Sequence, residues 1–335
     1  MQKLLISIVM PVKNTSLFLR ECLDSILKQT TTNWELLAVD DGSTDNSLEI
    51  LKKYSNKDNR IKIFINNGNG IIDALRLAYV NSSGELITRM DSDDRMSEDK
   101  LSVLSANLLD AGKGNIAVGL VNYFSENGVG EGFKNYENWL NGLILKGNNF
   151  KEIYKECVIP SPCWMVYRED LERCDAFNPS RYPEDYDLTF RFYLNGLKPI
   201  PCDKVLHHWR DYPTRTSRTD EHYADNTFIE IKTHYFLTHE YNAEKNLVVW
   251  RAGGKGKALA QLLIEQNIEF QWICDNPKKI GKDIYDQKIL SFNELDNING
   301  AQSIVTVANP KAQLEIKKYF EDRNQVLMRD FFFFC

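Results

Sequence analysis

Three aspartates within four residues are the part of this 335-residue sequence best suited to chemistry. Asp91, Asp93 and Asp94 follow the apolar run at residues 86–90, which places them together at the end of a predicted strand. Carboxylates this close repel one another unless a cation lies among them. Oxygen ligands without adjoining Cys or His suit Mg2+ or Mn2+, which keep open positions for phosphate oxygens. The run therefore indicates a metal-bound nucleoside diphosphate, and its alternative interpretation is a solvated acidic turn.

An alternation of strands and helices must position these carboxylates. Apolar runs predict strands at residues 4–10, 35–40, 61–65 and 86–90, with helices between them, including one at residues 71–79. Right-handed crossovers turn this order into an α/β fold, a mostly parallel sheet flanked by helices that binds ligands beyond the carboxyl ends of its strands. The polar loops at residues 11–14, 40–45 and 91–94 should therefore line one crevice.

A second group of carboxylates lies at a predicted helix start. Glu184 and Asp185 precede the apolar positions Leu188, Phe192 and Leu194. The helix dipole and the free backbone N–H groups of a first turn stabilise an ionised carboxylate. Such a group can cap the helix, or it can accept a proton from a hydroxyl group.

Four blocks of the sequence, in this order, resemble those of the family 2 glycosyltransferases. They are Ser7-Ile-Val-Met-Pro-Val-Lys-Asn14, Leu23-Asp-Ser-Ile-Leu-Lys-Gln-Thr30, Trp34-Glu-Leu-Leu-Ala-Val-Asp-Asp-Gly-Ser-Thr-Asp45 and Asp91-Ser-Asp-Asp94. The similarity covers roughly residues 5–220, and several ordered blocks are more specific than one motif. The resemblance implies a GT-A fold, Mn2+ or Mg2+, and inverting transfer from a nucleotide-sugar, expected to be UDP-linked. The expected acceptor is a hydroxyl of a glycan or lipid-linked molecule in surface polysaccharide synthesis.

The resemblance also implies roles for single residues on the donor side. Asp41 is expected to contact the base, Asp91 the ribose or donor sugar, and Asp93 the cation that bridges the diphosphate. Asp94 is expected either to contact the donor sugar or to support the residues that do. The further donor contacts expected are Pro11, Val12, Asn14, Asn67, Arg76, Ser92 and Arg210.

On the acceptor side, the resemblance makes Asp185 the general base, which would take the proton of the attacking hydroxyl. Glu184 or Asp187 would orient or support it, and Trp164 is expected to contact or support the acceptor.

The sequence departs from the family pattern after Trp209 and Arg210. A metal-binding histidine is expected there, but Tyr212 occupies its place. His208 is the candidate that could replace it, although a lone histidine is more often packed or hydrogen-bonded. The guanidinium groups of Arg210 and Arg215 suit a diphosphate, and the loop that carries them could close over the donor.

Residues 112–150 are rich in Gly and Asn. Residues 116–124 are strand-like, and Phe133, Tyr136 and Trp139 follow without a clear period. Long irregular segments are either functional loops or surface excursions. We expect a loop of one of these two kinds, and the first would shape the acceptor site.

Around residue 240 the pattern restarts, which predicts a GT-A domain at 1–240 and a small Rossmann-like domain at 241–335. Strands are expected at 246–250, 270–275 and 303–308, with a Gly-rich turn at 251–257. Arg251 occupies the first glycine position of a dinucleotide fingerprint, so a structural role, or one in a homo-oligomer, is favoured over nucleotide binding. The run Asp330-Phe-Phe-Phe-Phe-Cys335 could contact a membrane or a partner, but a buried last strand is favoured, because a short aromatic run lacks flanking cations.

Composition excludes other classes. With 43% apolar and 26% charged residues the chain is globular, and a net charge of -6 without a basic block argues against nucleic-acid binding. Its seven cysteines form no C-x-x-C pair, which argues against a disulfide framework or a zinc site. No segment approaches the roughly 20 apolar residues of a membrane span. We expect a cytoplasmic protein, with at most a peripheral contact at the inner face of the membrane.

Rival functions stay open. A nucleotide-sugar-binding protein without turnover would explain Tyr212. A sugar-phosphate nucleotidyltransferase would also use an α/β sheet with an Asp-bound metal, but Met10-Pro-Val-Lys-Asn14 lacks the glycines of its phosphate loop. A dehydrogenase would depend on the C-terminal glycines alone.

Overall fold

The computed structural model describes residues 4–219 and 228–335. The chain forms two compact units. Unit 1 combines Met1–Phe150 with Val158–Arg218, and unit 2 combines Lys151–Cys157 with Thr219–Cys335. This packing divides the chain earlier than the predicted domain boundary at residue 240, which stays a prediction.

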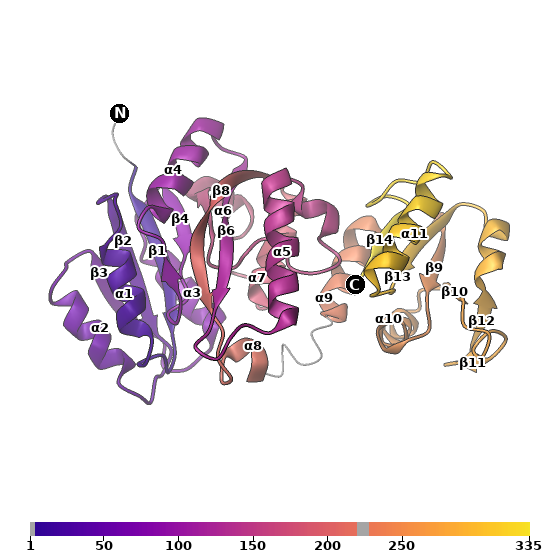
Figure 1. Cartoon of the computed structure of the whole chain (residues 1–335), viewed down its shortest axis with the longest axis horizontal. Helices are drawn as coiled ribbons and strands as arrows, with labels where there is room; N and C mark the ends of the chain where they lie inside the picture. The colour runs from indigo at the N-terminus through magenta and orange to yellow at the C-terminus, as the bar shows by residue number, and fades with distance from the viewer. Residues whose placement is uncertain (1–3, 220–227) are drawn as a thin grey trace. The chain divides into compact units, whose positions relative to one another are not determined.

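Unit 1 is built on an eight-stranded sheet of order β3-β2-β1-β4-β7-β6-β8-β5 (Figure 1). Its strands are β1 (Ile6–Val12), β2 (Trp34–Asp40), β3 (Ile61–Ile65), β4 (Leu86–Arg89), β5 (Arg95–Met96), β6 (Asn115–Phe124), β7 (Trp164–Tyr167) and β8 (Lys198–Arg210). Strands β7 and β5 run antiparallel to their neighbours, and the other adjacent pairs are parallel. The predicted mostly parallel α/β sheet is confirmed.

Helices flank this sheet because their apolar residues recur at helical spacing. In α1, for example, Leu19, Cys22, Leu23 and Ile26 are all buried on one face. The helices of unit 1 are α1 (Leu19–Leu27), α2 (Ser47–Ser55), α3 (Ile71–Val80), α4 (Lys100–Ala111), α5 (Glu131–Lys146), α6 (Arg168–Arg173) and α7 (Glu184–Leu194). A 3₁₀ turn (Asn149–Glu152) and the short α8 (Thr216–Thr219) lie where the chain passes between the units.

The carboxyl ends of the parallel strands meet at one edge of the sheet. Val12 lies opposite Asp40 in the β1–β2 register, and Val9 lies opposite Arg89 in the β1–β4 register. Strand β8 runs in the same direction and is paired with β6 up to its last residue. The loops that follow β1, β2, β4 and β8 therefore lie at this edge, which we call the carboxyl edge.

The loop predicted within residues 112–150 is wrong, because α5 occupies much of this stretch. The helix buries Leu140, Leu143 and Ile144, all in its C-terminal half. Asn141 accepts a hydrogen bond from the Val121 N–H (3.0 Å) and donates one to the Val121 carbonyl (2.8 Å). Its amide thus takes the place of a neighbouring strand beyond the last β6–β7 pair. The Gly and Asn content of the stretch conceals a helix whose apolar face is short.

Unit 2 has a smaller sheet of order β11-β12-β10-β9-β13-β14, parallel except for the β11–β12 pair (Figure 1). Its strands are β9 (Asn246–Trp250), β10 (Gln271–Cys274), β11 (Asp283–Ile284), β12 (Gln287–Ser291), β13 (Ala301–Val305) and β14 (Phe331–Phe333). Its helical segments are α9 (Ile229–Tyr235), a π-helical turn (Phe236–Glu240), α10 (Gly254–Glu265), a 3₁₀ turn (Phe292–Asn297) and α11 (Pro310–Glu321). The predicted second, smaller α/β sheet is confirmed.

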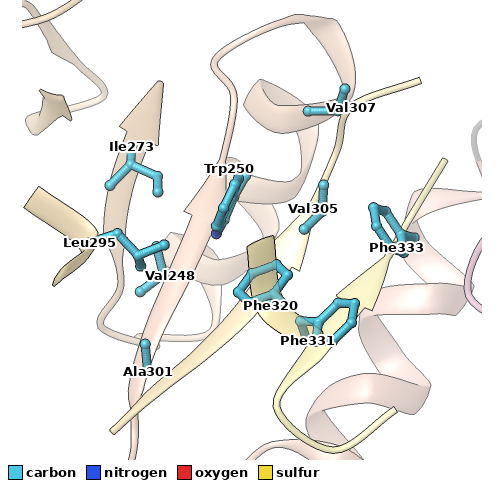
Figure 2. Close-up of a cluster of buried hydrophobic side chains, with 10 residues drawn as sticks. All are labelled: Val248, Trp250, Ile273, Leu295, Ala301, Val305, Val307, Phe320, Phe331 and Phe333. Carbon is cyan, nitrogen blue, oxygen red and sulfur yellow. The ribbon is translucent and has the colours of Figure 1, made fainter. Parts of the chain in front are cut away.

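The C-terminal phenylalanines form part of the core of unit 2, shown in Figure 2 with residues of β9, β10 and β13. The rings of Phe320 and Phe331 are stacked with centroids 4.2 Å apart, and Phe331 and Phe333 are buried on β14. The terminal run is therefore a buried last strand, as predicted.

The Gly-rich turn of unit 2 has an arginine where a glycine is favoured. Arg251 has a φ of 75°, in the left-handed region. A Cβ atom at Gly256 would lie 2.0 Å from the Arg251 carbonyl oxygen, so only glycine fits there. The turn keeps the close packing of a fingerprint motif without its first glycine.

Candidate active site

Asp94 is committed to contacts within the protein. It is fully buried at the carboxyl edge, and its Oδ1 accepts a hydrogen bond from the Arg210 N–H at 2.7 Å. His207 Nε2 lies 2.9 Å from its Oδ2. Both carboxylate oxygens are thus occupied, and Asp94 fastens the loop after β4 to β8. This geometry favours the supporting role predicted for Asp94 over a direct contact with the donor sugar, and both stay predictions.

Asp93, by contrast, keeps one oxygen available. Tyr212 Oη donates to its Oδ2 at 2.8 Å, and its Oδ1 has no partner among residues 4–219 and 228–335. Burial, together with the charges of Asp94 and Asp91, raises the pKa of Asp93 to about 7, although Arg215 opposes the shift. Tyr212, which stands where the family pattern has a histidine, is therefore a partner of this carboxylate.

A divalent cation fits this edge if it is shared with a phosphate. The described residues contain no group of three or more His, Cys, Asp and Glu side chains able to hold a metal ion. Mg2+ in nucleotide sites is usually held by one or two carboxylates and by substrate phosphates. Asp93 Oδ1 supplies one such ligand, and Asp91 Oδ2, which has no partner in the described chain, supplies a second. This oxygen donor set suits Mg2+ or Mn2+.

His207, and not the predicted His208, is the histidine that contacts Asp94. Successive residues of a strand point to opposite faces, so the contact of His207 with Asp94 turns His208 to the other side of β8. Burial, Arg95 and Lys100 lower the pKa of His208, and no carboxylate contributes. The geometry does not support His208 as a metal ligand, and that role stays a prediction. Sequence reasoning missed His207, which differs by one residue in register.

Arg89 links the aspartates to the start of α7. Its Nε donates to Asp91 Oδ1 and its Nη1 donates to Glu184 Oε1, each at 2.9 Å, and its side chain is 6% exposed. Burial opposes its charge, but Asp91, Glu184 and Asp185 raise its pKa above the usual range. Sequence reasoning missed Arg89 because it lies inside an apolar strand run. A buried cation there could have drawn attention to it, since such a charge needs partners.

Asp185 is partly exposed in the first turn of α7. Burial and the charge of Glu184 raise its pKa to about 7, while Arg89 acts in the opposite direction. The Tyr186 N–H donates to its Oδ1 at 2.8 Å. A carboxylate with a pKa near neutrality can exchange a proton with a hydroxyl group. Asp187 is instead buried and paired with Arg191 (2.8 Å), so it fixes α7.

Arg210 is held inside the protein. Its guanidinium carbon lies 4.5 Å from the ring centroids of both Phe18 and Phe124, and it pairs with Glu21. Its Nε donates to the Asp93 carbonyl at 2.8 Å. Arg210 thus braces the loop after β4, and this does not support its predicted contact with the diphosphate.

Arg215 is the arginine whose charge acts on the aspartates. Burial opposes its ionisation, but Asp94, Asp93 and Asp91 raise its pKa above the usual range. Its guanidinium carbon lies 5.9 Å from the Trp209 ring centroid. It therefore supplies positive charge beside the carboxyl edge.

Comparison with known proteins shows the family of this chain. Residues 7–175, half of the chain, match the family model described as glycosyl transferase family 2. The chain belongs to this family. The glycosyltransferase GlyA of Streptococcus pneumoniae is 32% identical over 215 residues, which cover 61% of this chain and 30% of GlyA. The chain thus matches less than a third of the length of that relative.

Two solved structures share the fold. Staphylococcus aureus TarS in complex with UDP-GlcNAc has a TM-score of 0.53 and 21% identity, and the match covers 77% of this chain and 71% of that chain. The mannosyltransferase PcManGT of Pyrobaculum calidifontis, in complex with GDP-Man and Mn2+, has a TM-score of 0.51 and 16% identity, covering 70% and 63%. The GT-A-type fold is therefore shown for this member of the family.

Among the expected donor contacts at the carboxyl edge, Asp41 lies inside the protein, whereas three others lie on its surface. Asp41 is buried, and its Oδ1 accepts from Asn66 Nδ2 (2.7 Å) and from the Gly70 N–H (3.0 Å), so it holds the loop after β3. The three on the surface are Pro11, near the end of β1, and Asn14 and Asn67, in the loops after β1 and β3. Asn14 and Asn67 both have a φ of 52°.

Other expected contacts lie in the interior. Val12 is fully buried, and Ser92 accepts a hydrogen bond from Thr15 Oγ1 at 3.0 Å. Trp164 is 2% exposed and packs against Phe192 of α7, which favours the supporting role predicted for it over a direct contact with the acceptor. Arg76 donates to the Phe177 carbonyl at 2.8 Å, so it ties α3 to the loop before α7. Among the described residues, no helix has the length and apolarity needed to cross a membrane.

Proposed function

We propose that this chain transfers a sugar from a UDP-linked donor to a hydroxyl of a glycan or lipid-linked acceptor, with inversion at the anomeric carbon. The observation that carries the proposal is the Arg89 bridge, which joins Asp91 on the donor side to Glu184, the neighbour of the candidate base. TarS binds UDP-GlcNAc, and this supports a UDP-linked donor. Surface polysaccharide synthesis at the cytoplasmic face of the membrane is the setting that the family resemblance favours.

In this proposal Asp185 takes the proton of the acceptor hydroxyl as its oxygen attacks the anomeric carbon. The reaction is a single displacement without a covalent enzyme intermediate. Glu184 and Arg89, which are paired with each other, set the ionisation of Asp185 through their charges, and Arg215 supplies positive charge beside the departing diphosphate. Asp93 and Asp91 would hold Mn2+ or Mg2+, which stabilises the charge of the leaving group when bound.

Unit 2 is proposed to have a structural or oligomerising role. The support is Arg251, which occupies the turn position where nucleotide-binding folds have glycine and adopts the φ that favours glycine.

Two variants test the transferase proposal. Asp93→Ala should lose both donor hydrolysis and transfer. Asp185→Asn should still bind donor, seen as thermal stabilisation by UDP-sugars with Mn2+, but should not transfer sugar. The control is Asp110→Asn, which changes an exposed carboxylate on α4 and should leave both rates unchanged.

Full transfer by Asp185→Asn would remove the proposed base. Donor binding without hydrolysis or transfer by the wild-type chain, across UDP-sugars and acceptors, would favour the binding protein without turnover.

A further inference from the structure

A pocket of about 670 Å³ lies beside α3. The aspartates of the candidate active site, which are Asp91, Asp93, Asp94 and Asp185, do not line it. Its volume is in the range of small-molecule sites. We call it the α3 pocket and define it by Asn69, Asp73, Tyr79, Val80, Phe177 and Asn178. The residues come from the loop after β3, from α3 and from the loop between α6 and α7.

The two arginines of this pocket are engaged by protein groups. Arg76 pairs with Asp73 and donates to Ser180 Oγ (2.7 Å) and to a backbone carbonyl (2.8 Å). Arg168 donates to the Gly84 carbonyl and to a serine hydroxyl, each at 2.8 Å. Arg76 uses its Nε and both of its Nη groups in hydrogen bonds within the protein, and Arg168 uses its Nε and Nη2, so the pocket offers few donors to a phosphate or carboxylate. Its ligand should be uncharged.

The remaining lining groups combine aromatic surface with hydrogen-bonding groups. The rings of Tyr79 and Phe177 meet edge to face at 5.8 Å. The amide of Asn69 and Asp73 Oδ2 have no side-chain hydrogen bond to other described residues. A sugar ring presents both apolar C–H faces and hydroxyl groups, so it matches this combination of surfaces.

The pocket lies close to the loop that carries the candidate base. Gly70, next to Asn69, is so near Tyr182 that a Cβ atom at Gly70 would lie 3.3 Å from Tyr182 Oη. Tyr182 is three residues before Asp185. The carbonyl of Ala176, which lies in the same loop between α6 and α7, accepts a hydrogen bond of 2.7 Å from Arg191 of α7. The loop that forms one wall of the pocket is thus held to the last turn of α7, and Tyr182 lies along the chain between the pocket residues of this loop and the candidate base.

We propose that the α3 pocket is a subsite for an uncharged sugar residue of the acceptor glycan. This proposal depends on the transferase function proposed above. It gives the acceptor a place on unit 1 apart from Asp91 and Asp93, with Tyr79 and the exposed Val80 as apolar surface for its C–H face and amide and carboxylate groups for its hydroxyls.

The test uses the full chain and a panel of neutral disaccharides, with binding measured by saturation-transfer NMR. Val80 lines the pocket and is 76% exposed, so Val80→Arg should obstruct it without disturbing the core. We expect disaccharides to bind the wild type and to bind Val80→Arg about tenfold more weakly. Leu109→Arg, an exposed leucine on α4 outside the pocket, is the matched control and should bind like the wild type.

The proposal is overturned if no neutral sugar binds, if Val80→Arg binds as well as the wild type, or if UDP with Mn2+ displaces the sugar. Donor hydrolysis by the wild type separates the two proposals. Hydrolysis without sugar binding contradicts only the subsite, and sugar binding without hydrolysis contradicts only the transferase. In the variant, a folding defect would lower hydrolysis and transfer together, whereas a subsite defect raises the acceptor KM.

Discussion

Replacing Arg89 by methionine tests the electrostatic arrangement of the site. The side chain of Arg89 lies 2.9 Å from carboxylate oxygens of both Asp91 and Glu184 and is almost completely buried. Methionine fills similar space without charge or donors, so both carboxylates lose this partner. Removal of one member of a buried ion pair costs about 3–5 kcal/mol. We therefore expect a clear loss of stability in urea unfolding.

The same change should move the pH dependence of transfer. The pKa of Asp185 is about 7 and its ionised form is the proposed base, so activity is lost as the pH falls through about 7. The charge of Arg89 lowers this pKa, and its removal must therefore raise it. A nearby opposite charge shifts a carboxyl pKa by about 1–3, and the lower end suits a partly exposed group. At pH 7 the ionised fraction would fall from about one half to about one tenth, and the rate about fivefold.

The assay is kcat/KM for transfer as a function of pH. We expect the inflection of Arg89→Met to lie about one pH unit above that of the wild type, with little difference well above pH 8. Lys113→Met is the control, because the Lys113–Glu169 pair is exposed and solvent screens its charges. An unmoved inflection in an Arg89→Met protein that is folded and binds donor would refute the reasoning. The double variant Arg89→Met, Glu184→Gln should recover part of the stability, since it removes a charge left unpaired.

Two further predictions concern stability. His207→Ala should destabilise the chain by about 1–3 kcal/mol, because Asp94 Oδ2 loses its partner inside the protein, whereas His208→Ala should stay within about 0.5 kcal/mol. Equal losses in thermal denaturation would contradict the strand register. Phe331→Ala should cost about 3–5 kcal/mol, because it removes a stacked ring from the core of unit 2, while Leu314→Ala on the exposed side of α11 should change little. A urea midpoint for Phe331→Ala like that of the control would contradict the burial of the last strand.

The sequence predicted the strands well because buried parallel strands are nearly continuous apolar runs. Strand β3 has the predicted bounds, and β2 begins one residue before its predicted start. Helix α5 was missed because its buried residues are only Leu140, Leu143 and Ile144, all in its C-terminal half. Periodicity detects burial, and a helix that buries little gives little signal.

The site was predictable as a set of neighbours and much less as a set of roles. Asp91, Asp93 and Asp94 are adjacent in sequence and do lie together, but sequence cannot show which carboxylate oxygens are used by the protein itself. Asp94 has both oxygens occupied, while Asp93 keeps one available. Such differences depend on β8, which lies more than a hundred residues away along the chain.

Arg89 shows why separate motifs give an incomplete account. The aspartates after β4 and the pair at the start of α7 are distinct blocks, and sequence reasoning gives each its own role. One guanidinium contacts both, 2 residues from Asp91 and 95 residues from Glu184. Because the pKa of Asp185 depends on Glu184 and Arg89, a change in charge on the donor side must affect the ionisation of the base. The two blocks therefore act as one electrostatic unit, and a pH profile reports on both.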